Sequence, residues 1–130
     1  MTWFQLKEWW WYRRHALSRH GVHSPFVYDF IDKGLRRKSG SVDARVRDYF
    51  QSVPIVVVER PELAAAMLQQ VSEDTIVVVK NIHSSPEAVV AWQALCATAK
   101  VTMSMDLFEL GLLLFRKEFK VKQRFVVKRY

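Results

Sequence analysis

The sequence predicts an α/β fold in which parallel strands are followed by an antiparallel hairpin and preceded by helices. Two unbroken β-branched runs, 55–58 and 76–79, have the pattern of strands that are buried on both faces of a parallel sheet. A stretch with helical spacing, 61–71, starts at a proline between these runs, and a second helical stretch follows them. This order of strand, helix, strand and helix predicts a right-handed βαβα unit.

Helices are expected before the first strand. Thr2 can cap a helix that reaches His20, where Gly21 follows as a stop signal. Tryptophans lie on several sides of this helix, so we expect it to be covered on more than one side. A helix at a membrane interface is the alternative. Ser24 and Pro25 then predict the start of a second helix that runs to about residue 35.

Shorter segments connect these elements and complete the chain. A basic linker over 36–41 and a short helix over 42–50 precede the first strand. After the second strand, Ser84 or Ser85 can cap a helix that ends near Ala99. The remainder predicts strands over 101–108 and 112–115, joined as an antiparallel hairpin, and a further strand over 123–130.

The composition indicates where the protein is located and which kinds of partner it could bind. The single cysteine, Cys96, allows no disulfide framework, and charged residues interrupt the apolar stretches. We therefore expect a cytoplasmic protein without a signal peptide or a transmembrane segment. The net charge of +7 suits nucleic acid or an anionic membrane. Nucleic acid remains an alternative partner that no RNP-type motif, zinc finger or glycine-rich phosphate loop supports.

Three stretches carry a resemblance to a known family: 20–28 (HGVHSPFVY), 81–87 (NIHSSPE) and 106–112 (DLFELGL). They resemble class I S-adenosylmethionine-dependent methyltransferase-like proteins related to the catechol-type O-methyltransferases. The resemblance covers roughly the first 35 residues and the chain from about residue 54 onward. It implies a truncated methyltransferase or Rossmann-like sheet in a single domain over 1–130, with a helical segment at 1–38 and a half α/β unit at 53–130.

The resemblance also implies that the cofactor-binding half is missing. Family members have a glycine-rich turn after the first strand and an acidic residue after the second. Only four glycines are present here, and none lies in such a turn. The stretch before Pro54 is too short for the missing βα units, which need about 30 residues each. We therefore expect no cofactor, unless S-adenosylmethionine binds with a half that is supplied in trans.

The strand ends that survive differ from the family pattern. Glu59 stands where the family typically has an aspartate near its substrate, and Lys80 and Asn81 stand where metal-dependent members have two aspartates. A lysine ammonium repels a divalent cation, so we assign no metal, catalytic or cofactor-binding residue. The predicted remnant of the ancestral pocket comprises His23, Glu59, Lys80, Asn81 and His83.

The histidines allow a structural and a chemical interpretation. His20, His23 and His83 match no zinc spacing, and we interpret them as residues that bond the backbone of capped turns. An acid–base pair of Glu59 and His83 at the carboxyl ends of adjacent strands is the alternative.

Loss of half a sheet would expose the edge of the strand at 55–58. The Trp-rich helix, a second copy of the chain or another protein could cover this edge. We expect a homodimer that forms through the edge, through the Trp-rich helix, or through both. The expected function is an interaction or assembly module without methyltransferase activity. The alternatives are methyltransferase activity recovered in a dimer or split complex, and a basic nucleic-acid-binding module.

Overall fold

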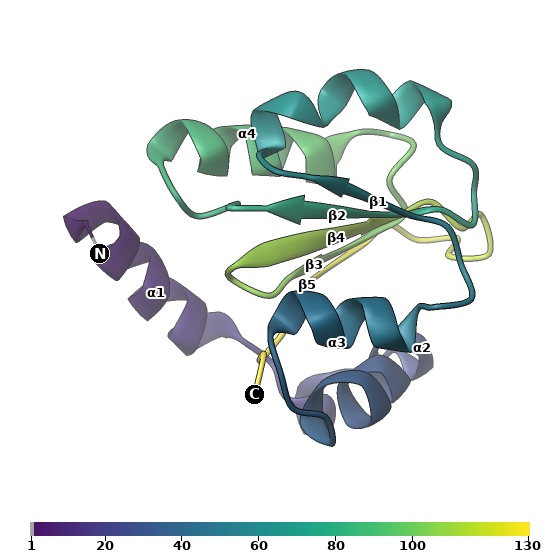
Figure 1. Ribbon diagram of the computed structural model, residues 1–130, viewed down its shortest axis with the longest axis horizontal. Coiled ribbons are helices and arrows are strands. Elements are labelled where there is room, and N and C mark those ends of the chain that lie inside the picture. The colour runs from purple at the N-terminus through teal and green to yellow at the C-terminus, as the bar shows by residue number, and fades with distance from the viewer. Residues whose placement is uncertain (1) are drawn as a thin grey trace.

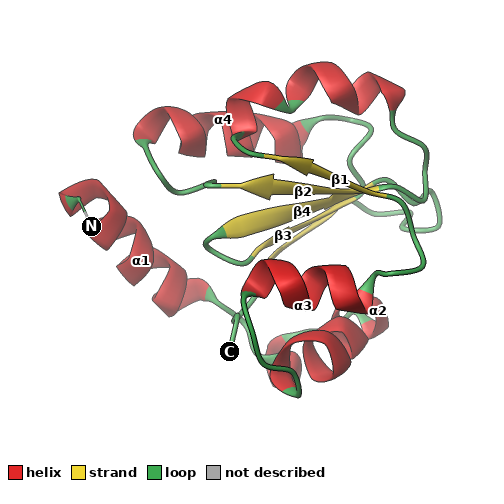
Figure 2. Ribbon diagram, in the orientation of Figure 1, coloured by secondary structure: helices red, strands yellow, loops and turns green. Residues whose placement is uncertain are grey.

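The computed structural model describes residues 2–130, which form a five-stranded mixed sheet with helices on both faces (Figures 1 and 2). The strand order is β1-β2-β4-β3-β5. β1 is parallel to β2, β4 is antiparallel to both of its neighbours, and β5 is parallel to β3. The carboxyl ends of all strands except β4 therefore meet at one end of the sheet. The strands are β1 (Ile55–Val58), β2 (Ile76–Lys80), β3 (Met103–Asp106), β4 (Leu110–Leu114) and β5 (Gln123–Val126).

This arrangement confirms the predicted α/β class, in which parallel strands are followed along the chain by an antiparallel hairpin. The parallel pair and the antiparallel hairpin form where the sequence predicts them. The hairpin is inserted so that its second strand, β4, lies between β2 and β3. The last strand is shorter than predicted, because it ends at Val126 and only an isolated bridge at Val127 continues it.

Serine and threonine caps start the α-helices at the predicted positions. The side chains of Thr2, Ser24, Ser41 and Ser85 each accept a hydrogen bond from a backbone N–H of the first turn, so Ser85 rather than Ser84 caps α4. None of the helices described from residue 2 onward is long and apolar enough to cross a membrane. The helices are α1 (Trp3–His15), α2 (Pro25–Asp29), which continues as a π-helix over Phe30–Arg36, α3 (Val42–Tyr49) and α4 (Pro86–Ala97).

Two helical predictions are wrong in detail. α1 ends at His15 rather than His20, because Ala16 is extended and a separate 3-10 turn follows at Arg19–Gly21. The segment predicted as one helix over 61–71 forms two 3-10 helices, Pro61–Leu63 and Ala65–Gln70. Pro61 and Ala64 are both buried, and the 3-10 geometry brings residues three apart onto one side.

The sheet separates two apolar cores. The helices α2 and α3 cover one face, and α4 with the 3-10 segments covers the other (Figure 1). β2 contributes alternate residues to both cores, Val78 to the first and Val77 and Val79 to the second. This confirms the prediction that its β-branched run is buried on both faces. β1 is only half-buried over Ile55–Val57, because it lies at the edge of the sheet.

The two edges of the sheet differ. Leu17 extends the β5 edge, since its N–H donates to the carbonyl of Val126 at 2.8 Å and its carbonyl accepts from the N–H of Lys128 at 2.9 Å. Among residues 2–130, β1 pairs with β2 alone. The idea that the Trp-rich helix folds over the β1 edge is therefore wrong. The extended segment after α1 runs instead along the opposite edge of the sheet.

The Trp-rich helix is also less covered than predicted. Tyr12 is its one buried residue among those described, whereas the side chains of Trp3 and Trp10 are 75% and 56% exposed. The expectation that this helix is covered on more than one side is therefore wrong within a single chain. One side packs on the sheet, and the other faces outward.

Gly111 in β4 is needed for the packing of α4 on the sheet. A Cβ at this position would overlap the ring of Trp92, which is buried. We expect Gly111→Ala to lower the free energy of unfolding in urea by about 1–3 kcal/mol, because the ring cannot move away without disturbing its core. Gly21→Ala is the control, since its Cβ would meet only the flexible side chain of Leu17 at 3.3 Å. An equal loss in both variants would contradict this explanation.

Candidate functional site at the carboxyl ends of the strands

α1 lies across the end of the sheet to which the β1 and β2 arrows point (Figure 1). Tyr12 donates its hydroxyl hydrogen bond to the carbonyl of Val127, directly after β5. Gln5 Nε2 donates to the carbonyl of Ser84, in the loop after β2, at 3.3 Å. Open α/β sheets bind their ligands at this end, so α1 occupies the region where a site is expected.

A buried histidine is at the centre of this region. His83 Nδ1 lies 2.7 Å from Oε1 of Glu8 on α1, and His83 Nε2 lies 2.6 Å from Oδ2 of Asp106 at the end of β3. His83 and Asp106 are each 4% exposed. Both ring nitrogens face carboxylate acceptors, and only an imidazolium can donate to both of them. The ring of Phe108 stacks on the imidazole at a centroid distance of 5.2 Å.

The carboxylates keep this imidazole charged. Burial by itself opposes the charged form, but the hydrogen bonds and negative charges of Asp106 and Glu8 outweigh it and raise the pKa of His83 above its ordinary value. His83 therefore forms ion pairs with two carboxylates. These ion pairs link three elements: α1, the loop after β2 and the end of β3. Such a group stabilises a fold only while all of its members are present.

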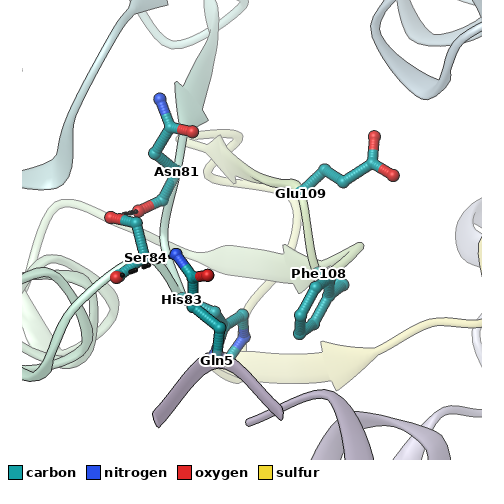
Figure 3. Close-up of a pocket in the computed structure, with 6 residues that line it drawn as sticks. All are labelled: Gln5, Asn81, His83, Ser84, Phe108 and Glu109. Carbon is teal, nitrogen blue, oxygen red and sulfur yellow. Dashed lines mark hydrogen bonds between the residues drawn. The ribbon is translucent and has the colours of Figure 1, made fainter. Parts of the chain in front are cut away.

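A hollow of about 210 Å³ opens beside the histidine (Figure 3). Figure 3 shows the Glu109 carboxylate extending away from the other side chains, and this carboxylate pairs with Arg129. The volume lies below the roughly 300–1,000 Å³ of ordinary small-molecule sites. The hollow is lined by Gln5, Asn81, His83, Ser84, Phe108 and Glu109.

Two residues that line the hollow have left-handed backbone conformations. The φ angles of Asn81 and Phe108 are 59° and 69°, a region that costs free energy for residues other than glycine. A hydrogen bond stabilises each of the two turns. Asn81 Nδ2 donates to the carbonyl of Glu59 at 2.9 Å, and the N–H of Phe108 donates to Oδ1 of Asp106 at 2.8 Å. Asp106 therefore uses one oxygen for the turn and the other for His83.

This arrangement is better suited to holding α1 in position against the sheet than to catalysis. A general base needs a nitrogen lone pair that can reach a substrate, and both nitrogens of His83 already face carboxylates. Both oxygens of Asp106 are engaged as well. Within residues 2–130, no group of three or more His, Cys, Asp or Glu side chains could hold a metal ion.

The five residues predicted to form a remnant pocket are only partly brought together. Asn81 and His83 line the hollow, while Glu59 does not line it and contacts Asn81 through its backbone carbonyl. Lys80 is directed to Asp43 on α3, with Nζ 3.8 Å from Oδ2. His23 lines a different hollow, beside Phe26 and Phe119.

The partners of His83 differ from both sequence interpretations. It bonds neither a capped turn nor Glu59, but Glu8 and Asp106. Neither carboxylate was predicted from the sequence, because they lie 75 and 23 residues away along the chain. One local signal could have indicated Glu8: it is the only acidic residue in a helix that is otherwise aromatic and basic.

Comparison of the chain with protein-family models, with curated proteins and with solved structures found no match. The resemblance to methyltransferase-like proteins therefore remains a prediction.

The His83 ion pair should make stability depend on pH. Because the folded-state pKa is raised, its contribution is complete below the unfolded value of about 6.5 and is lost as the pH rises through the folded-state pKa. We expect the free energy of unfolding in urea to fall above about pH 6.5 in the natural chain. His83→Gln should remove this slope and cost about 3 kcal/mol near pH 6, since it leaves Asp106 buried without its cation.

His23→Gln is the matched control, because His23 is exposed and has no hydrogen-bond partner among the described side chains. It should retain the pH dependence of the natural chain. The same slope in His83→Gln as in the natural chain would show that His83 does not hold the charge.

Proposed function

We propose that this chain is a non-catalytic assembly module of methyltransferase-like ancestry, in which two copies associate through the free edges of β1. The observation that carries the proposal is that free edge. The reversed β4 beside a parallel β1–β2 pair supports the ancestry, because the resemblance implies a parallel unit that ends in an antiparallel hairpin.

The backbone of β1 is suited to further strand pairing. The N–H of Ile76 donates to the carbonyl of Pro54 at 2.9 Å. Backbone groups alternate in direction along a strand, so Val56 also faces β2, and Ile55 and Val57 direct their N–H and C=O groups away from it. These outward groups form the unpaired ladder that a second strand can extend.

Within its four residues, Ile55–Val58, the β1 edge has no charged side chain, proline or bulge, and Pro54 directly precedes it. Protective edges carry charged residues, proline or a bulge, whereas β1 has the sequence IVVV and continuous register with β2. Antiparallel pairing of two β1 strands about a two-fold axis would join the two sheets and use the same surface on each copy.

The partly covered carboxyl end of the sheet supports a role without catalysis. α1 covers the ends of β3 and β5 and the loop after β2, and its Glu8 occupies a nitrogen of the one histidine in this region. At the positions that the resemblance relates to metal-binding aspartates, Lys80 forms an ion pair and Asn81 holds a turn. These residues maintain the fold and are not free for a substrate.

Light scattering and sedimentation equilibrium test the assembly. We expect a dimer at micromolar concentration, and we expect Val57→Pro to weaken it at least about tenfold, because proline removes the outward N–H. Val57→Ala is the matched control, since it shortens the side chain but keeps the N–H. Far-UV circular dichroism establishes that both variants are folded. A monomeric natural chain, or equal weakening by both variants, would contradict association through β1.

Calorimetric titration with S-adenosylmethionine tests the absence of catalysis. We expect no binding with a dissociation constant below about 100 µM, near −5.5 kcal/mol, since the chain offers no glycine-rich turn for the cofactor. The demethylated product, titrated in the same way, should also show no binding. Binding of either compound below that concentration would favour a cofactor site restored by dimerisation.

A further inference from the structure

The outward side of α1 combines large apolar side chains with cations. Trp3 is 75% exposed, Trp10 is 56% exposed and Leu6 is 38% exposed. Spacings of three and four residues place these side chains along one side of the helix, with basic residues beside them. We call this side the outer face; it comprises Trp3, Leu6, Lys7, Trp10, Arg13 and Arg14.

The contacts of the opposite side determine the orientation of this face. Glu8 pairs with His83, Tyr12 donates to the carbonyl of Val127, and Gln5 donates to the carbonyl of Ser84. Since Gln5, Glu8 and Tyr12 share one side of the helix, the residues of the outer face point away from the sheet. The exposure of two tryptophans is therefore a consequence of specific hydrogen bonds on the other side.

The outer face is strongly cationic. Glu8, the only acidic residue of α1, is turned inward and engaged by His83. Within residues 2–130, no ion pair engages Lys7, Arg13 or Arg14. The guanidinium of Arg13 lies over the ring of Trp10 at 5.7 Å, so the apolar and charged parts of the face are adjacent.

We propose that the outer face of α1 binds the surface of an anionic lipid bilayer, with the helix lying in the plane of the headgroups. Indole rings favour the interface between headgroups and acyl chains, and lysine and arginine reach the anionic headgroups from the same depth. At 1.5 Å per residue, this 13-residue helix is about 20 Å long, enough for shallow binding along its whole length.

The charge of the outer face favours a membrane over a second copy of the chain as its binding partner. Two outer faces in contact would bring their cations together, which costs free energy, whereas anionic lipids neutralise them. The inference is independent of the proposed β1 dimer, because the outer face and the β1 edge are formed by different elements. A dimer would carry two such helices and bind vesicles with higher avidity.

Vesicle sedimentation with the full chain tests the inference. The chain should sediment with vesicles of phosphatidylcholine mixed with phosphatidylserine, and much less with vesicles of phosphatidylcholine alone. Replacement of Arg13 and Arg14 by glutamine should lower the partition coefficient about 25-fold, since each cation contributes about fivefold. Replacement of Trp3 and Trp10 by serine should lower it at least about tenfold, because both indoles leave the interface.

Replacement of Lys117 and Lys120 by glutamine is the matched control, since both are exposed cations outside α1. It should change the partition coefficient much less than the arginine pair. Equal binding to both kinds of vesicle, no binding to either, or equal weakening by the control pair would overturn the proposal. Loss of dimerisation in the tryptophan variant with unchanged vesicle binding would assign the face to protein association instead. A shift of single-stranded RNA by the natural chain without vesicle binding would assign it to nucleic acid.

Discussion

The structure depends on the charged hydrogen bonds that His83 makes with Glu8 and Asp106. They are the point at which the N-terminal helix, the loop after β2 and the end of β3 are joined. A buried imidazolium is favourable only with its carboxylates in place, because His83 or Asp106 left alone would be an uncompensated buried charge. The position of α1 is therefore linked to the integrity of the sheet end.

The fixed position of α1 has two effects on the surface of the protein. It covers the end of the sheet where ligands of open α/β folds bind, and it turns Trp3 and Trp10 outward. The same helix thus covers part of one surface and forms another that is aromatic and cationic. The left-handed turns at Asn81 and Phe108 belong to this arrangement, since they shape the loops that present His83 and its stacked ring.

β2 is the other structural constraint, because its β-branched side chains enter both cores and fix the layers above and below the sheet. β1 shares the β-branched sequence but has a strand on one side only. A chain that buries one such strand completely and leaves its neighbour at a free edge is suited to association. The proposed dimer would therefore form through backbone groups at that edge rather than through a separate apolar patch.

Local sequence was sufficient for the strands, the helix caps and the α/β class, because these follow from side-chain periodicity and from hydrogen bonds within one turn. Ser24 and the IVVV runs are examples. Asn81 and His83 were found as candidate residues because both follow a strand end. Tertiary structure decided the partners of His83, the side of the sheet to which α1 attaches and the exposure of Trp10. The reason is that Glu8 and Asp106 meet His83 across 75 and 23 residues of chain, and no local pattern encodes contacts at such separations.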